Sequence, residues 1–183
     1  LATAIHETPG VAVKVVHHPF LLDPSTPPEG RDLRAHLEGK YGIPADGMFD
    51  RVSAFGARDG LSWAWDQVRI GPNTEASHAL IDWAPDTAKD AVVAALHDTY
   101  FLHGRDLGDA EVLVAAAMAA GLDAADARAA VTDPSRRAKV RSAALAASYD
   151  GISGVPLYVI GGRALQGAQR PDALKSALLA AAR

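Results

Sequence analysis

The part of the chain best suited to chemistry is a backbone feature: one proline, Pro156, stands directly before the apolar run Leu157–Ile160. Proline has no N–H to give to a sheet ladder, so within sheets it is confined to edges, first residues and bulges. We therefore expect a strand after Pro156, a tight turn at Gly161-Gly162 and a second strand over Arg163–Gln166. Pro156 therefore marks the expected start of the first of these strands.

Side-chain chemistry is limited by what the sequence lacks. The 183 residues include no cysteine, so they can form no disulfide and no thiolate metal site. His17 and His18 are neighbours in a strand-like run, so their side chains point to opposite faces and cannot hold one metal ion together. The remaining histidines lack the spacing of a motif such as His-Glu-x-x-His, and we expect no metal site.

Other polar and aromatic groups favour structural roles. The basic run Arg136–Arg141 lies in a helical pattern and is expected to be a solvated helix face rather than an anion site. Trp63 and Trp65 alternate as in a short strand or a cleft wall, and core packing is the favoured interpretation. A formal net charge of −4 and an isoelectric point near 5.9 argue against nucleic-acid binding. No apolar run approaches the ~20 residues needed to span a membrane, and no signal peptide is visible, so we expect a cytoplasmic protein.

The elements that must position these residues follow from the hydrophobic pattern. Val11–Phe20 is rich in valine and nearly continuous in apolar character, which is typical of a strand buried on both faces of a sheet. From Arg31 to about Ser148 the pattern predicts about seven helices and no strand. A last helix is expected to begin at Pro171. The predicted order is therefore strand, helices, two strands and a helix.

Short motifs along essentially the whole chain resemble, in order and spacing, the FrnE type of DsbA-like oxidoreductases. These motifs are Phe20-Leu21-Leu22-Asp23-Pro24, Lys40-Tyr41-Gly42, Pro72-Asn73-Thr74 with Ser77-His78, Tyr100-Phe101 with Gly104, Gly121-Leu122-Asp123, Gly151-Ile152-Ser153-Gly154-Val155-Pro156 and Gly167-Ala168-Gln169. The resemblance implies an α/β, thioredoxin-like fold with a large all-helical insertion. Residues 1–27 and 150–183 would form the thioredoxin-like domain, and residues 28–149 the helical domain. It also implies a cis peptide bond between Val155 and Pro156.

The resemblance also exposes a gap at the N-terminus. Members of that family begin with a central strand that leads into a Cys-Pro-Trp-Cys-type motif at the start of a helix, and Leu1–Glu7 corresponds only to the tail of that helix. About twenty residues would therefore lie upstream, including the strand between Val11–Phe20 and Leu157–Ile160. Without it, each unpaired backbone group costs about 1–3 kcal/mol, so we expect that the chain as given does not fold as a monomer.

Site roles follow from the resemblance, residue by residue. In that family a thiolate at a helix N-terminus attacks a disulfide, so the catalytic cysteines are expected upstream of the given residues. Val155 and Pro156 are expected to bind the substrate, because the backbone beside the proline stays free to pair with it. Asn73 could lie near the reacting sulfur, as in related glutathione-using enzymes, although a helix N-cap is favoured. Ala168 and Gln169, before the last helix, could hold a glutathione carboxylate.

Three functions of different classes stay open. The first is a FrnE-type thiol–disulfide oxidoreductase that needs no cofactor and acts on a dithiol or disulfide protein or on a small thiol. The second is a glutathione-dependent isomerase or transferase of the hydroxychromene-carboxylate isomerase or kappa class, with a serine in place of the first cysteine. The third is a non-catalytic peptide-binding module. Gly167-Ala168-Gln169 favours the first, since the glutathione users tend to carry an aspartate in that turn. Without a thiolate the given chain is expected to be inactive, and a homodimer stays open.

Overall fold

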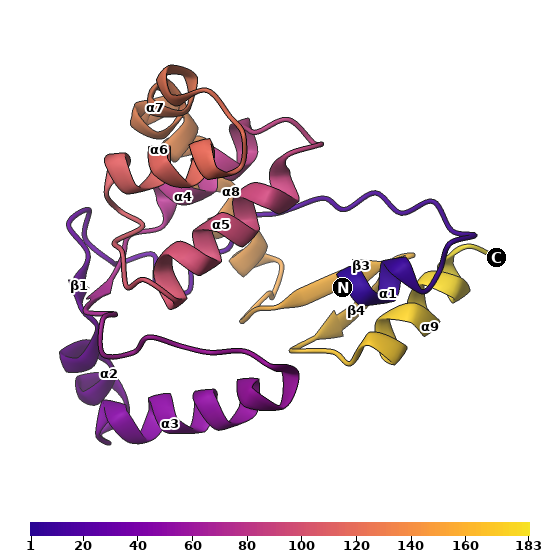
Figure 1. Cartoon of the computed structure of the whole chain (residues 1–183), viewed down its shortest axis with the longest axis horizontal. Coiled ribbons are helices and arrows are strands. Elements are labelled where there is room, and N and C mark those ends of the chain that lie inside the picture. The colour runs from indigo at the N-terminus through magenta and orange to yellow at the C-terminus, as the bar shows by residue number, and fades with distance from the viewer.

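The computed structural model describes all residues from Leu1 to Arg183, most of them in helices (Figure 1). The helices are α1 (Ala2–His6), α2 (Leu33–Tyr41), α3 (Ala45–Gly56), α4 (Glu75–Trp83), α5 (Lys89–Phe101), α6 (Ala110–Ala119), α7 (Ala124–Thr132), α8 (Pro134–Tyr149) and α9 (Pro171–Ala181), with a 3-10 turn at Ala57–Asp59. Four short strands pair in two separate sheets: β1 (Arg31–Asp32), β2 (Ile70–Gly71), β3 (Leu157–Ile160) and β4 (Arg163–Gln166). None of the helices combines the length and the apolar character needed to cross a bilayer.

Helix boundaries follow the capping residues in the sequence. The Asp32 carboxylate accepts a hydrogen bond from the Ala35 N–H at the start of α2, and Gly42 ends that helix in the left-handed conformation. Asp133 caps α8 by accepting a hydrogen bond from the Ser135 N–H, ahead of a proline at the first helical position. The structure has seven helices, α2 to α8, where about seven were expected, and α9 begins at Pro171 as predicted.

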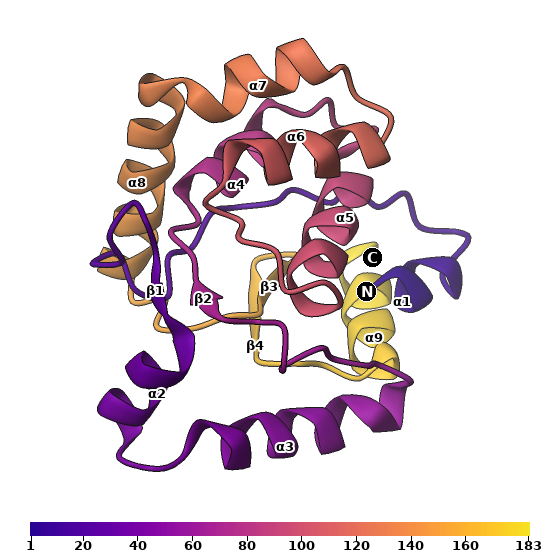
Figure 2. The same cartoon turned by 60° about the vertical axis from the view of Figure 1, so that its left-hand side comes forward.

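The main hydrophobic core lies among α4, α5, α6 and α7. Leu80 of α4, Val92 of α5, Leu113 of α6 and Val131 of α7 are fully buried there. Figures 1 and 2 show these four helices packed together, with α8 beside α4. This helical block is the rigid support from which α4 and α5 face the site described below.

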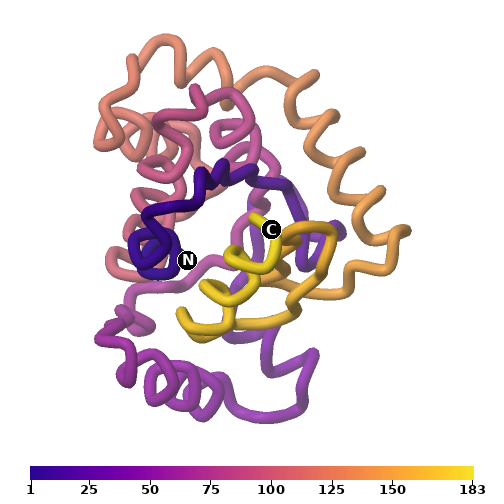
Figure 3. Tube along the Cα trace, turned by 90° about the vertical axis from the view of Figure 1, so that its right-hand side faces the viewer, coloured from indigo at the N-terminus to yellow at the C-terminus, as the bar shows by residue number.

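A second, smaller hydrophobic cluster supports the C-terminal hairpin. β3 and β4 pair antiparallel around the expected two-glycine turn. Tyr158 and Ile160, on one face of β3, pack against Leu174 and Leu178 of α9 and against Ala4 of α1. Because α1 lies beside α9, the two ends of the chain come close together (Figure 3).

The predicted strand over Val11–Phe20 is wrong, because this segment is extended but belongs to no sheet. Its side chains alternate between half-buried and exposed positions from Val11 to His18, as they would in a strand. Val13 reaches the cluster that supports the hairpin. However, no backbone group from Ala12 to Phe20 makes a hydrogen bond to another backbone group. The composition is that of a strand, but a ladder needs a partner, and no other strand of the chain pairs here. We call Val11–Phe20 the extended segment.

Two polar contacts join the extended segment to α5 and to the turn before it. The Lys14 Nζ lies 2.9 Å from Asp86 Oδ2, and the His17 Nε2 lies 2.7 Å from Asp90 Oδ1. Both carboxylates are well exposed, so such pairs contribute little to the free energy of unfolding. They orient the segment rather than replace a ladder.

A small sheet between Arg31 and Ser148 is absent from the sequence prediction. β1 and β2 pair antiparallel over two residues each. Gly30, ahead of β1, has a φ of +73°, and a Cβ there would lie 2.6 Å from Ile70 Cγ2. A side chain at residue 30 would therefore collide with Ile70 of β2. Two-residue strands leave almost no periodicity for sequence analysis to detect.

Candidate functional site

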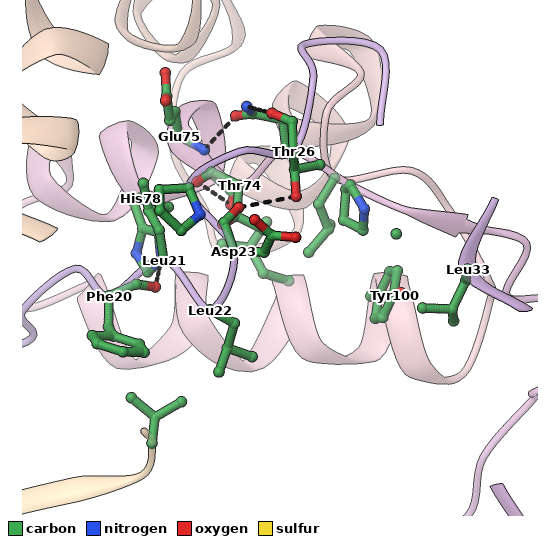
Figure 4. A pocket seen from close by; sticks show the side chains of 18 of the residues that line it. Phe20, Leu21, Leu22, Asp23, Thr26, Leu33, Thr74, Glu75, His78 and Tyr100 are labelled. Atoms are coloured by element: carbon green, nitrogen blue, oxygen red, sulfur yellow. Dashed lines mark hydrogen bonds between the residues drawn. The ribbon is translucent and has the colours of Figure 1, made fainter. Parts of the chain in front are cut away.

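A pocket of about 600 Å³ lies between α2, α4, α5 and the residue before the hairpin. Its walls come from the end of the extended segment and the turn after it, from α2, from the start of α4 and from α5 (Figure 4). Most of the lining surface is apolar, and the apolar side chains that contribute to it include Phe20, Leu33, Leu37, Ile81, Leu96 and Val155. The volume falls in the range that proteins use to enclose small molecules or single side chains of a partner.

Val155 and Pro156 stand where the pocket meets the hairpin. Val155 lines the pocket and is half exposed, and Pro156 directly precedes β3. The peptide bond between them is cis, which is the geometry expected from the sequence. The N–H and C=O of Val155 make no backbone hydrogen bond, whereas the Pro156 carbonyl accepts one from the Gly167 N–H at 2.8 Å. The Val155 backbone is therefore free to pair with a ligand, as a substrate-binding role requires.

The outer edge of β3 is also unpaired. Ile160 pairs with Arg163 of β4 directly beside the two-residue turn, and Tyr158 pairs with Leu165. In this register the two pairs exchange backbone hydrogen bonds. In an antiparallel ladder the intervening residues turn their N–H and C=O groups away, so the backbone of residues 157 and 159 points outward. Among the edges without partners, those of β3 and of the extended segment both lie beside α1 and α9.

An ion-pair cluster borders the pocket on the side of α2. Arg31 Nη1 donates to Asp23 Oδ2 at 3.0 Å, and His36 Nε2 lies 3.8 Å from the same oxygen. Hydrogen bonds from the hydroxyl and the N–H of Ser25, together with the positive Arg31, hold the pKa of Asp23 below its usual range. Asp23 is therefore ionised at neutral pH and compensates the charge of Arg31.

Asn73 lines the pocket, but its side chain serves the fold. Its Oδ1 accepts a hydrogen bond from the Glu75 N–H at 3.0 Å, and its Nδ2 donates to the Thr26 carbonyl at 2.8 Å. Asn73 thus caps α4 from the position before Thr74, close to the N-cap role that the sequence favours. A position next to a reacting sulfur stays a prediction.

Ala168 and Gln169 lie outside the pocket. The Gln169 Nε2 donates to the carbonyls of Gln166 and Gly167, at 2.7 and 3.3 Å, and so closes the turn ahead of α9. The structure does not bring these two residues together with Asn73. Their role toward a glutathione carboxylate stays a prediction.

Two polar side chains of the pocket wall are missing from the sequence-based candidates. His78 of α4 donates from Nε2 to the Phe20 carbonyl at 3.2 Å, and burial lowers the pKa of His78, so the ring is neutral at pH 7. Tyr100 of α5 donates its hydroxyl to the Ile70 carbonyl at 3.0 Å, and burial raises the pKa of Tyr100 to about 12. Both residues belong to motifs that carry the family resemblance, but no role was assigned to them there, and helical spacing does not distinguish a pocket from a core.

The two tryptophans pack as the sequence predicts, whereas the basic run on α8 forms ion pairs within the fold rather than only a solvated face. Arg141, from the basic run on α8, makes two hydrogen bonds to the buried carboxylate of Glu75, at 2.7 and 3.0 Å. Trp63 and Trp65 stack with ring centroids 5.2 Å apart, and Trp65 stacks on Phe49 of α3. No group of three or more His, Asp or Glu side chains is placed to hold a metal ion.

A helical block that precedes a cis-proline, a β-hairpin and a closing helix, with an apolar pocket beside the proline, defines a thioredoxin-like protein with a helical insertion. The family model of the DSBA-like thioredoxin domain matches residues 1–179, so this chain belongs to that family. Among solved structures, the chain is similar to a probable DsbA oxidoreductase from Streptomyces coelicolor, with 29% sequence identity and a TM-score of 0.81. The match covers 98% of this chain and 82% of that chain. A comparison with curated proteins gives no significant match.

The DsbA-like fold expected from the sequence is therefore confirmed. The family and the solved relative also support a function of the general thiol–disulfide oxidoreductase type. Because the 183 residues contain no cysteine, they hold no thiolate to perform that chemistry themselves.

Proposed function

We propose that this chain is the substrate-binding part of a FrnE-type thiol–disulfide oxidoreductase whose Cys-x-x-Cys motif lies on a segment N-terminal to Leu1. The observation that carries the proposal is the free backbone of Val155 at the border of an apolar pocket. A substrate chain placed there can pair with the Val155 N–H and C=O while one of its apolar side chains enters the pocket.

The unpaired edges of β3 and of the extended segment support a further strand in the complete fold. The extended segment and β3 contribute Val13, Tyr158 and Ile160 to the same hydrophobic cluster, so both lie over α1 and α9. A strand between these edges would supply hydrogen bonds to both, and each unmet backbone group that becomes buried costs about 1–3 kcal/mol. The resembled family has a strand at this place, and its redox motif follows directly after that strand.

The reaction proposed is thiol–disulfide exchange. The thiolate of the first cysteine attacks one sulfur of the substrate disulfide, so that a mixed disulfide forms as the substrate S–S bond breaks. The released substrate sulfur leaves as a thiolate and takes a proton from water. The thiolate of the second cysteine then attacks the mixed disulfide and releases the reduced substrate, leaving the protein disulfide. A dithiol reductant regenerates the protein in the assay below.

The test is to express the chain together with the residues encoded ahead of Leu1 and to measure reduction of insulin disulfides in the presence of dithiothreitol. The longer protein is expected to accelerate the reaction, a Ser substitution of its first cysteine to abolish the acceleration, and the 183-residue chain to show none. A longer protein that has serine at that position and binds glutathione would replace this proposal with the isomerase or transferase function.

A matched pair of variants tests the role of the free backbone. Val155→Pro removes the N–H that would donate a hydrogen bond to a substrate carbonyl, whereas Val155→Ala keeps this N–H. We expect the insulin activity of the longer protein to fall in the proline variant and to persist in the alanine variant. Equal activities, with both variants folded by circular dichroism, would show that the Val155 N–H does not bind substrate.

A further inference from the structure

A second pocket, of about 250 Å³, lies within the helical block, between the start of α4 and α8. It shares Asn73 and Glu75 with the apolar pocket but includes no residue of α2, of α5 or of the hairpin. Most of its surface is polar. From α8 it is lined by four residues that lie on one helix face, three or four positions apart: Pro134, Arg137, Ala138 and Arg141. The basic run of the sequence therefore turns two of its arginines to a cavity.

Arg137 brings a positive charge to this second pocket without a carboxylate partner. Its Nε and Nη2 donate to the Val131 carbonyl at the end of α7, at 3.0 and 2.7 Å. The other cations of the basic run each pair with a carboxylate. The two hydrogen bonds hold the half-buried guanidinium in place, and both hydrogens of its Nη1 are left without an acceptor in the protein.

The carboxylate of Glu75 does not neutralise the second pocket. Its side chain is 9% exposed, and both of its oxygens accept hydrogen bonds from Arg141, from Nε at 2.7 Å and from Nη2 at 3.0 Å. Figure 4 shows the Glu75 carboxylate directed away from the other labelled side chains of the apolar pocket. Glu75 is the one carboxylate among the lining residues, so two guanidinium groups face a single negative charge.

A backbone donor in the same lining is also unmet. The N–H of Ala76, a residue that is 4% exposed, donates to no acceptor in the protein. Buried N–H groups are nearly always paired, with protein groups or with ordered solvent. The second pocket therefore combines one positive charge in excess with free N–H donors from two arginines and from the backbone.

We infer that the second pocket binds a small phosphate-bearing anion, either inorganic phosphate or the phosphate group of a small monoester, held by the free Nη1 groups of Arg137 and Arg141. Guanidinium groups match phosphate in charge and in planar donor geometry. The several oxygens of a phosphate can accept from both arginines and from the Ala76 N–H. Because Arg137 is anchored to α7 and Arg141 to α4, the bound anion would join three helices. This inference is independent of the proposed function.

The test compares Ala138→Glu with Ala138→Gln in the longer protein, which includes the residues encoded ahead of Leu1. Ala138 is exposed on the α8 face that carries the two arginines, so neither side chain disturbs the core. Glutamate places a carboxylate where it competes with the anion, whereas glutamine has nearly the same size and helix propensity without the charge.

Thermal unfolding midpoints are measured against phosphate concentration at constant pH and ionic strength, and their dependence gives the affinity of the folded protein. We expect Ala138→Glu to weaken phosphate binding about tenfold and Ala138→Gln to leave it within about twofold of the unchanged protein. Phosphate also stabilises folded proteins without binding at a site, so the difference between the two variants is the readout. Equal midpoint shifts in both would overturn the inference.

A second pair of variants tests the arginine directly. Arg137→Gln should weaken phosphate binding about tenfold, since it removes a charged donor. Arg128→Gln is the matched control, because Arg128 pairs with Glu111 outside this pocket, and it should leave the affinity unchanged. Equal affinities in these two variants would also contradict the site.

Glycerol 3-phosphate and glycerol separate the two sources of the phosphate group. Tighter binding of glycerol 3-phosphate than of inorganic phosphate assigns the site to a phosphate monoester, and the reverse order assigns it to the free ion. A midpoint shift with glycerol as large as that with glycerol 3-phosphate would overturn the inference, because the charge would then play no part. Since no arm measures disulfide chemistry, failure here leaves the insulin result untouched.

Discussion

Gly104, just after α5, joins the pocket wall to the loop before β2. Its φ is +60°, and a Cβ there would lie 2.4 Å from the carbonyl carbon and oxygen of Gln67. The Gly104 N–H donates to the Tyr100 carbonyl at 3.0 Å, and the Ala64 N–H donates to the Phe101 carbonyl at 2.8 Å. The end of α5 and the loop are therefore in backbone contact beside two residues that line the pocket, Tyr100 and Phe101. Gly104→Ala must displace one backbone from the other.

The size of the effect follows from comparison with Gly121, just after α6. Gly121 also has a positive φ, +81°, but a Cβ there would meet nothing within 4 Å. Gly121→Ala therefore carries only the cost of an L-residue in the left-handed region, about 1–2 kcal/mol. Gly104→Ala carries the same cost and, in addition, about 1–3 kcal/mol for overpacking against the backbone of Gln67. The free energy of unfolding should fall by about 2–5 kcal/mol in the Gly104 variant.

Both variants are made in the longer protein, which includes the residues encoded ahead of Leu1, and are compared by urea unfolding followed by tryptophan fluorescence. Trp63 and Trp65 report directly on the displaced loop. We expect the Gly104 variant to unfold at clearly lower urea than the Gly121 variant and to show an altered native-state spectrum. Losses that agree within about 0.5 kcal/mol would refute the argument, because the left-handed conformation alone would then explain both.

Two further perturbations test other parts of the fold. Hydrogen bonds from Lys14 and Lys89 lower the pKa of Asp86 from 3.8 to about 2. The ionised carboxylate therefore contributes to the free energy of unfolding fully above pH 3.8, and this contribution is lost as the pH falls through 2. Asp86→Asn removes it at every pH. Because Asp86 is exposed, the effect is small: the decrease in urea midpoint from about pH 5 to about pH 2 should be slightly smaller in the variant, and an equal decrease would contradict the assignment. Leu80→Ala removes a side chain that is 0% exposed and should lower the free energy of unfolding by about 3–5 kcal/mol. Leu179→Ala, 43% exposed on α9, should cost under about 1 kcal/mol in the same urea titration.

Elements with their own local signals were predictable from the sequence. Asp133 and Gly42 act on backbone groups within a few residues, so the helices that they bound follow from composition alone. The hairpin is equally local, because two glycines between apolar runs specify both the turn and the register. Local contacts need no knowledge of the rest of the fold.

The extended segment shows where local signals fail. Val11–Phe20 has the composition and the alternating burial of a strand, but strand formation depends on a partner elsewhere in the chain. β1 and β2 show the reverse: they carry no strand pattern, yet they pair, and the absence of a side chain at Gly30 leaves room for Ile70 of β2.

By itself the sequence determined the helix boundaries, the hairpin and the candidate backbone at Val155-Pro156, because each depends on near neighbours or on a short motif. Only the tertiary structure decided which side chains form the pocket. Asn73 bonds to Thr26, 47 residues away, and His78 bonds to Phe20, 58 residues away. It also separated Ala168 and Gln169 from that pocket. The physical reason is that these contacts join helices and loops that are far apart in the sequence. Burial of the shared core sets how these elements pack, and the spacing of residues along the chain does not encode that packing directly.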